Sequence, residues 1–216
     1  MPLTTINQQS LISVSSIMSD AHSVFVIPTF QRPYAWEKEH IHDLQEDIKK
    51  TVKLLTSNSN DIHYLAPIHL IPYSTSDRRD KTLEAYLPKN DDVTLLLKSL
   101  NEQESEFINT DYEPLHVYFV IDGQQRLTTL YFIYTFVYRR ISSNPLNVTL
   151  LCGRQIPRLI HNDPYNHTYF KALLSNIASS NTLPISNTQA FFYSDQAVMS
   201  RKPAWMLDWF FKRSKM

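Results

Sequence analysis

One segment near the middle of the chain constrains the fold more than any other, because it joins a strand to a helix through a polar turn. Residues 115–121 form an alternating, largely apolar run that is typical of a strand. Residues 127–141 then place large apolar side chains at helical spacing. Between the two runs lie Asp122, Gly123, Gln124, Gln125 and Arg126. A helix start offers unpaired N–H groups and the positive end of a dipole, so we interpret this turn as a phosphate-handling site.

The glycine content excludes two common ways of holding a nucleotide. The chain has only two glycines, Gly123 and Gly153, where average usage of about 7% would give roughly fifteen. A P-loop and a dinucleotide fingerprint each need several closely spaced glycines. Any phosphate must therefore be held by side chains, and the amides of Gln124 and Gln125 and the guanidinium of Arg126 are suitable donors.

The overall composition indicates a soluble domain. The chain has 216 residues, of which 43% are hydrophobic, and its formal net charge is zero. Any contact with DNA must then come from a local patch of charge. The single cysteine, Cys152, excludes an internal disulfide and fits a reducing compartment. We expect no signal peptide, because the first residues have neither a basic segment nor an apolar one. No apolar run reaches the roughly 20 residues that span a bilayer, so we expect a cytoplasmic protein without a membrane partner.

The remaining periodicity predicts an α+β fold. Strands are expected over residues 23–27 and 63–71. Helices are expected over residues 4–20, 37–55 and 93–100.

Two domains are expected. Residues 1–145 should form the first, interrupted by an insertion over residues 72–113. Residues 146–216 should form a mostly helical extension. The last helix has little chain after it to pack against, which is compatible with a truncated piece of a longer protein.

Residues 27–36 (Ile-Pro-Thr-Phe-Gln-Arg-Pro-Tyr-Ala-Trp) are the second segment with chemical content. Gln31 and Arg32 lie beside Tyr34 and Trp36, which offers a planar fork for phosphate and aromatic faces for a base. A buried aromatic loop with a structural arginine is the alternative. Co-occurrence with the 122–126 turn favours the binding interpretation.

Residues 27–36 and 122–130 together resemble the N-terminal domain of GmrSD-type modification-dependent restriction proteins, in the ParB/sulfiredoxin-like superfamily. Supporting similarity extends the resemblance to about residues 20–175. It implies a small ParB/sulfiredoxin-like mixed sheet with flanking helices, followed by a mostly helical C-terminal part. Two departures are the long stretch over residues 72–113 and Ala66, where the family usually has glycine.

The resemblance also implies a function. Such a domain is an NTP-binding and NTP-hydrolysing specificity module, with Mg²⁺ as its cofactor and modified phage DNA as its target. It works with an HNH nuclease domain or subunit, which this chain lacks.

The family motif can be carried over residue by residue. Its catalytic residues would be Asp122, Gln124, Gln125 and Arg126. Its nucleotide- or DNA-binding residues would be Gln31, Arg32, Tyr34, Trp36, Gly123 and Thr128. Asp122 would hold Mg²⁺ or orient the attacking water, while Arg126 and Arg32 would neutralise charge on the phosphoryl group. An ordinary turn, with the glutamines capping the helix, is the alternative.

Two rival functions stay open from the sequence. One is a ParB-like switch that binds nucleotide or DNA without hydrolysis, and the other is a ParB-like nuclease that uses Asp122 for metal-dependent cleavage. Residues 161–167 contain the residue types of an HNH site, two histidines and an asparagine between them, within seven residues. A working HNH site spreads its ligands over a ββα unit of roughly thirty residues, so we interpret this likeness as accidental.

Overall fold

The computed structural model describes residues 12–56, 67–73, 84–106, 114–138 and 146–179. The chain divides into two compact units. The first, here named the sheet unit, comprises residues 1–33 and 68–179. The second, here named the α2 unit, comprises residues 34–67 and 180–216. The two units are described separately.

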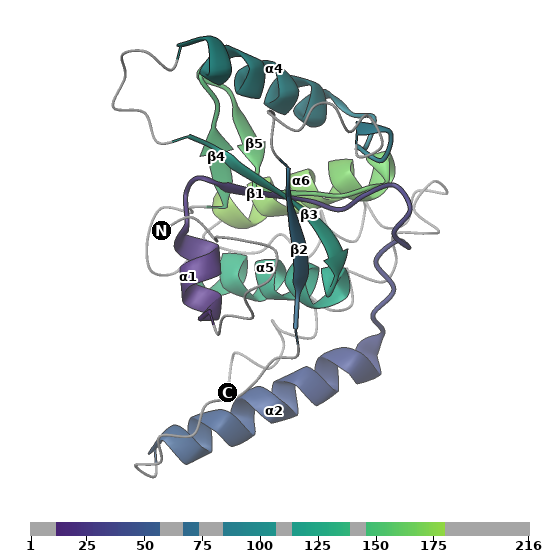
Figure 1. The fold of residues 1–216 in the computed structure, drawn as a ribbon. Helices are drawn as coiled ribbons and strands as arrows, with labels where there is room; N and C mark the ends of the chain where they lie inside the picture. The colour runs from purple at the N-terminus through teal and green to yellow at the C-terminus, as the bar shows by residue number, and fades with distance from the viewer. Residues whose placement is uncertain (1–11, 57–66, 74–83, 107–113, 139–145, 180–216) are drawn as a thin grey trace. The chain divides into compact units, whose positions relative to one another are not determined.

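A four-stranded mixed sheet is the centre of the sheet unit (Figure 1). Its strands are β1 (Ser23–Val26), β2 (His69–Tyr73), β3 (His116–Asp122) and β6 (Leu159–Ile160), in the order β2-β3-β1-β6. Strand β1 runs parallel to β3 and β6, whereas β2 is antiparallel to β3. The predicted α+β fold with a mixed sheet is therefore confirmed.

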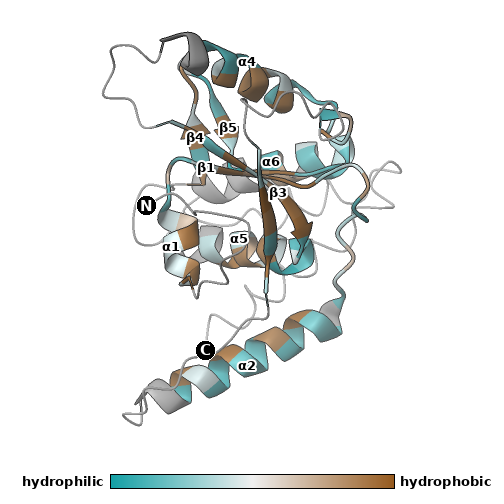
Figure 2. Cartoon of the chain, in the orientation of Figure 1, coloured by the Kyte–Doolittle hydropathy of each residue, from teal (hydrophilic) through white to brown (hydrophobic). Residues whose placement is uncertain are grey.

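The central strands are apolar along their length because both faces of the sheet are covered (Figure 2). All four residues of β1 are buried. Helix α4 (Asp91–Glu106) lies over one face, and α5 (Gln124–Tyr138) lies on the other. Helices α1 (Val14–Ser19) and α6 (Pro164–Ser179) pack against α5.

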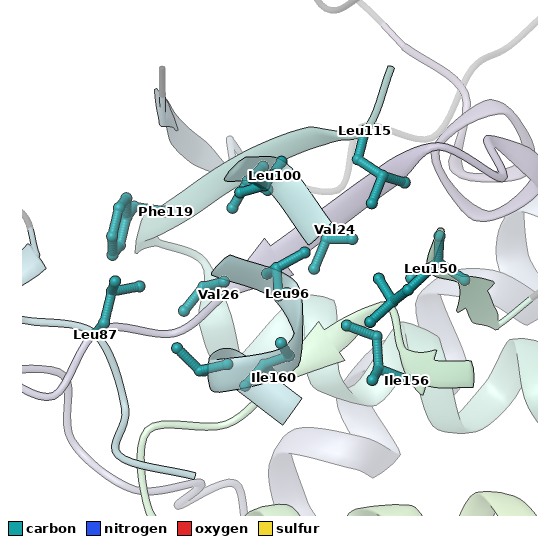
Figure 3. Close-up of a cluster of buried hydrophobic side chains, with 13 residues drawn as sticks. Val24, Val26, Leu87, Leu96, Leu100, Leu115, Phe119, Leu150, Ile156 and Ile160 are labelled. Atoms are coloured by element: carbon teal, nitrogen blue, oxygen red, sulfur yellow. The ribbon is translucent and has the colours of Figure 1, made fainter. Parts of the chain in front are cut away.

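The main hydrophobic core lies between α4, the sheet and a small hairpin (Figure 3). The hairpin pairs β4 (Asn147–Thr149) with β5 (Gln155–Pro157) in antiparallel register. Its turn contains Gly153 with a φ of 77°, a left-handed conformation that favours glycine. The buried members of this core are Val24, Val26, Leu87, Val93, Leu96, Leu100, Leu115, Val117, Phe119, Val148, Leu150, Ile156 and Ile160.

A fully buried arginine anchors the end of the sheet where β1 begins. The guanidinium of Arg158 donates to the carbonyl oxygen of Ser23 at 2.9 Å and to those of Met18 at 2.6 Å and Ile17 at 2.8 Å. The last two carbonyls belong to the final turn of α1, which has no further helical N–H to pair with them. Arg158 therefore fixes α1 to the sheet.

The α2 unit is described through residues 34–56. Its helix α2 (Lys38–Thr56) matches the predicted helix over residues 37–55 within one residue at each end. Polar and apolar residues alternate along it, as Figure 2 shows. Ile41 and Leu44 are buried, whereas Ile48 and Val52 are exposed.

Several elements differ from the sequence-based expectation. Strand β2 includes Pro72, although the sequence suggested that the strand ends before it. An edge strand tolerates proline because one side of its backbone needs no ladder hydrogen bond. Of the helix expected over residues 4–20, residues 4–11 lie outside the described part of the chain, and α1 covers Val14–Ser19.

The C-terminal part also differs from expectation within its described residues. Residues 146–179 contain three short strands before α6, and β6 is a member of the central sheet. Residues 146–179 therefore belong to the sheet unit. The rest of the expected extension, residues 180–216, lies outside the described part of the chain. Within that part, no helix is long and apolar enough to cross a membrane.

Candidate functional site

The three parallel strands deliver three loops to one edge of the sheet. Strand β1 leads into residues 27–33, here named the site loop. Strand β3 leads into the turn at Asp122 and Gly123, and β6 leads into the turn over residues 161–163. The carboxyl ends of parallel strands are where open sheets of this kind bind ligands. Residues 27–33 and the turn that begins at Asp122 therefore meet at this edge of the sheet.

Two buried glutamines of the turn are engaged by the site loop. The Nε2 of Gln124 donates to the carbonyl oxygen of Arg32 at 2.8 Å and to Oε1 of Gln31 at 3.3 Å. The Nε2 of Gln125 donates to the carbonyl oxygen of Pro33 at 3.0 Å. Both amides thus hold the loop, whereas the sequence suggested that they face a phosphate.

Gln31 is held from both neighbouring strands. Its Nε2 donates to the carbonyl oxygen of Ile121 at 2.6 Å, at the end of β3. Its own carbonyl oxygen accepts a hydrogen bond from Nδ2 of Asn162, in the turn after β6. Sequence reasoning missed Asn162, and the only signal was an amide directly after a short apolar run. Gln31 is therefore a structural centre of the loop.

Gly123 makes the sharp change from strand to helix possible. Its φ is 83°, a conformation that side-chain-bearing residues rarely adopt. Its carbonyl oxygen accepts from the N–H of Leu127 at 2.9 Å, which starts the helical pattern of α5. The first N–H groups of α5, and the positive end of its dipole, therefore begin directly after Asp122.

The charged side chains of the site are more accessible than its amides. The side chain of Asp122 is 64% exposed, that of Arg126 is 24% exposed, and Nη2 of Arg126 lies 3.8 Å from Oδ2 of Asp122. Arg32 is exposed. A contact this long and this solvated holds the pair only weakly. The guanidinium of Arg126 is therefore available to an anionic ligand.

A histidine from the edge strand also reaches this end of the sheet. His69 is the register partner of Asp122, and the pairing is irregular between His69 and Leu70. Such β-bulges commonly lie next to active sites, where they redirect side chains. His69 is exposed. The sequence offered no ligand spacing that would have identified it.

An exposed aromatic pair lies on the site loop. Phe30 is 53% exposed and Tyr86 is 39% exposed. Their rings meet edge to face, with centroids 5.1 Å apart. The N–H of Thr29 donates to the carbonyl oxygen of Tyr86 at 2.9 Å, which fixes the segment before α4 against the loop. Phe30 and Tyr86 therefore present an exposed aromatic pair beside the site loop.

Comparison with known proteins decides the family. A family model described as the GmrSD restriction endonuclease, N-terminal domain, matches residues 14–203. The chain belongs to this family. It is therefore a restriction-system module, and the family implies DNA and a nuclease partner in general terms. A search of curated proteins found no match.

Three further predicted residues of this GmrSD-type domain are Thr128, Tyr34 and Trp36. Thr128 is buried on α5. Tyr34 and Trp36 belong to the α2 unit, where the Trp36 ring stacks on His40 with centroids 6.0 Å apart. Their contribution to a ligand stays a prediction.

Residues 161–167, which resemble an HNH sequence, make structural contacts within the GmrSD-type domain. His167 contacts Asp92, and Oδ1 of Asp163 accepts the N–H of Asn166 at 2.8 Å at the start of α6. Burial lowers the pKa of His161 to about 3, so this imidazole is neutral. Within the described ranges, no three His, Cys, Asp or Glu side chains converge as metal ligands.

Proposed function

We propose that this domain binds a nucleoside triphosphate at the carboxyl edge of β1, β3 and β6 and hydrolyses it as the specificity step of a restriction system. The observation that carries the proposal is that the amides and the charged side chains of the turn have different partners. Gln124 and Gln125 hold the site loop, which leaves Asp122, Arg126 and Arg32 as the accessible charged groups.

Phosphate binding follows from the positive groups at this edge. Arg126 lies in the first turn of α5, so its guanidinium and the dipole of α5 both favour an anion there. The weak contact between Arg126 and Asp122 is readily exchanged for a charge-assisted hydrogen bond to phosphate. Arg32 supplies a second cation from the site loop, whose backbone Gln124 holds.

Asp122 is the residue that would hold Mg²⁺. One accessible carboxylate suffices in many nucleotide sites because substrate phosphates and water complete the coordination. The bound ion would neutralise charge on the phosphates. Hydrolysis would join the oxygen of a water molecule to the γ-phosphorus and break the bond from that phosphorus to the β–γ bridging oxygen, which releases the nucleoside diphosphate and inorganic phosphate. Asp122 can also accept a hydrogen bond from that water.

The aromatic residues around the loop are proposed to bind the base or the target DNA. Phe30 offers an exposed ring beside Gln31 and Arg32, and Tyr86 supports it. Tyr34 and Trp36 follow in the chain and are proposed to add further aromatic contacts. Each base stacked on an aromatic ring contributes about 1–3 kcal/mol.

A non-hydrolysing switch is the second candidate, and one observation favours it. The amide groups of Gln124 and Gln125 that could orient an attacking water donate instead to backbone carbonyls. Arg126 and Arg32 would still bind a nucleotide, whose occupancy would then signal to a separate nuclease.

Phosphate release from ATP, GTP, CTP and UTP, each with and without modified DNA, tests the proposal. Turnover that Arg126→Ala abolishes supports the hydrolase. Saturable nucleotide binding without phosphate release supports the switch. Arg154→Ala is the matched control, because Arg154 is exposed on the β4–β5 hairpin. Cleavage of plasmid by the purified chain with Mg²⁺ or Mn²⁺ would instead support a nuclease.

A further inference from the structure

A buried ionic cluster joins α4 to α6. The carboxylate of Asp92, near the start of α4, lies 2.7 Å from Nε2 of His167 and 2.7 Å from Nζ of Lys171. Asp92 and His167 are almost fully buried, whereas the side chain of Lys171 is 44% exposed. Hydrogen bonds from His167 and Lys171 outweigh the effect of burial and lower the pKa of Asp92. Asp92 is therefore a buried carboxylate with two partners.

The hydrogen bonds fix the tautomer of His167. Its Nδ1 accepts the backbone N–H of His161 at 3.3 Å, so Nδ1 carries no proton. The hydrogen of the neutral ring must then be on Nε2, which donates it to Asp92. One imidazole thus connects a carboxylate on α4 to the backbone just after β6.

That backbone belongs to the turn that holds the site loop. His161 is followed directly by Asn162, whose amide donates to the carbonyl oxygen of Gln31. The connection therefore runs from Asp92 through His167 and the 161–163 turn to Gln31, next to Arg32. Since His167 is buried, it does not meet a ligand itself.

We propose that His167 is a positioning residue, which fixes the 161–163 turn so that Asn162 holds the site loop and its Arg32 in the ligand-binding arrangement. The effect on the loop follows from the contacts alone. The effect on nucleotide affinity rests on the proposed function.

Two variants of His167 test its contact with Asp92 and its contact with His161 separately. His167→Gln places an amide near the position of Nε2, so it keeps a donor for Asp92 and loses the acceptor for His161. His167→Asn places its oxygen near the position of Nδ1, so it keeps that acceptor and loses the donor. Asn162→Ala removes the hydrogen bond from Asn162 to the carbonyl oxygen of Gln31. Arg158→Lys is the control, because it weakens a buried polar cluster at the opposite end of β1.

Hydrogen exchange of peptides covering residues 28–33 is the first measurement, because it needs no nucleotide. We expect exchange to be roughly fivefold to tenfold faster in His167→Gln and in Asn162→Ala, as the loss of one hydrogen bond predicts. The double variant should be no faster than Asn162→Ala alone, because both changes break the same connection. Unchanged exchange in a folded His167→Gln variant, or additive effects in the double variant, would overturn the proposal. So would equal acceleration in Arg158→Lys.

Nucleotide kinetics are the second measurement. Displacement of Arg32 should raise KM for the triphosphate roughly tenfold while changing kcat less. A fall in kcat alone contradicts the positioning role. If the wild-type chain neither binds nor hydrolyses triphosphates, the proposed function fails, whereas the exchange measurement still decides the role of His167.

Discussion

The side-chain amide of Gln124 donates to the carbonyl oxygen of Arg32 at 2.8 Å, across 92 residues of chain. This contact makes the two polar segments of the sequence one structure, because the start of α5 determines the path of the loop after β1. It also changes the interpretation of the glutamines. Their Nε2 groups hold the loop, and we propose that the ligand contacts Asp122, Arg126 and Arg32.

Substitution of Gln124 should weaken ligand binding although Gln124 itself is not proposed to contact the ligand. Gln124→Ala leaves the carbonyl oxygen of Arg32 without its donor, at a cost of about 1–3 kcal/mol. Gln124→Glu should be worse, because a carboxylate would face two oxygen atoms. Thermal melting and nucleotide titration measure both effects. Gln155→Glu, on the exposed side of β5, is the control, and an equal loss there would contradict the loop-holding role.

Arg126→Ala and Asp122→Ala should separate binding from hydrolysis. Loss of Arg126 removes a charge-assisted contact and should weaken nucleotide binding with and without Mg²⁺. Loss of Asp122 removes a negative charge, so binding in EDTA should be preserved or tighter, whereas Mg²⁺-dependent turnover should disappear. Titrations in EDTA and in Mg²⁺ test this difference. Equal turnover in wild type and Asp122→Ala would remove Asp122 from the catalytic residues.

Phe30→Ala should weaken binding of a base while preserving the fold. The ring is exposed and contributes little to the core, but one stacking contact is worth about 1–3 kcal/mol. Fluorescence titration with single-stranded DNA and with nucleotides provides the measurement. Tyr165→Ala is the control, because Tyr165 is 80% exposed on α6. Comparable losses in the two variants would exclude a specific stacking role.

Arg158→Met should destabilise the sheet unit strongly. The variant leaves three carbonyl oxygens without their donor, so a loss of roughly 3–5 kcal/mol in the free energy of unfolding is expected. Arg158→Lys should lose less stability, because lysine retains the positive charge. It should still lose some, because lysine lacks the planar fork of donors. Urea unfolding measures both values. A loss below about 1 kcal/mol would contradict the anchoring role.

Stability should decrease in mild acid because of His161. Burial lowers the pKa of His161 from 6.5 to about 3. The unfolded chain therefore binds this proton first, and stability should fall by roughly 1.4 kcal/mol per pH unit as pH drops below about 6.5. His161→Phe should remove that component. Urea unfolding at about pH 7 and about pH 5 tests it, and parallel losses in both proteins would contradict it.

Sequence patterns predicted the elements with a clear period and missed contacts made across the fold. Strands β1 and β3 and helices α2 and α5 follow from apolar runs that are long enough to show a periodicity. Strand β6 has two residues, too few for any pattern. The amide of Gln124 is chemically suited to a phosphate or to a carbonyl, so its partner could not be inferred before Arg32 was placed. Asn162 and Tyr86 likewise reach the loop only through the tertiary structure.

Three of the hydrogen bonds that hold the site loop have a consequence for synthesis of the protein. They join residues that are 90, 92 and 131 positions apart, so each closes a large loop of chain. Contacts between such distant residues form late, after local helices. A nascent chain that has emerged only as far as Gln125 can make the first two of these hydrogen bonds but lacks Asn162. The hydrogen bond from Asn162 to Gln31 can therefore form only after translation has passed β6.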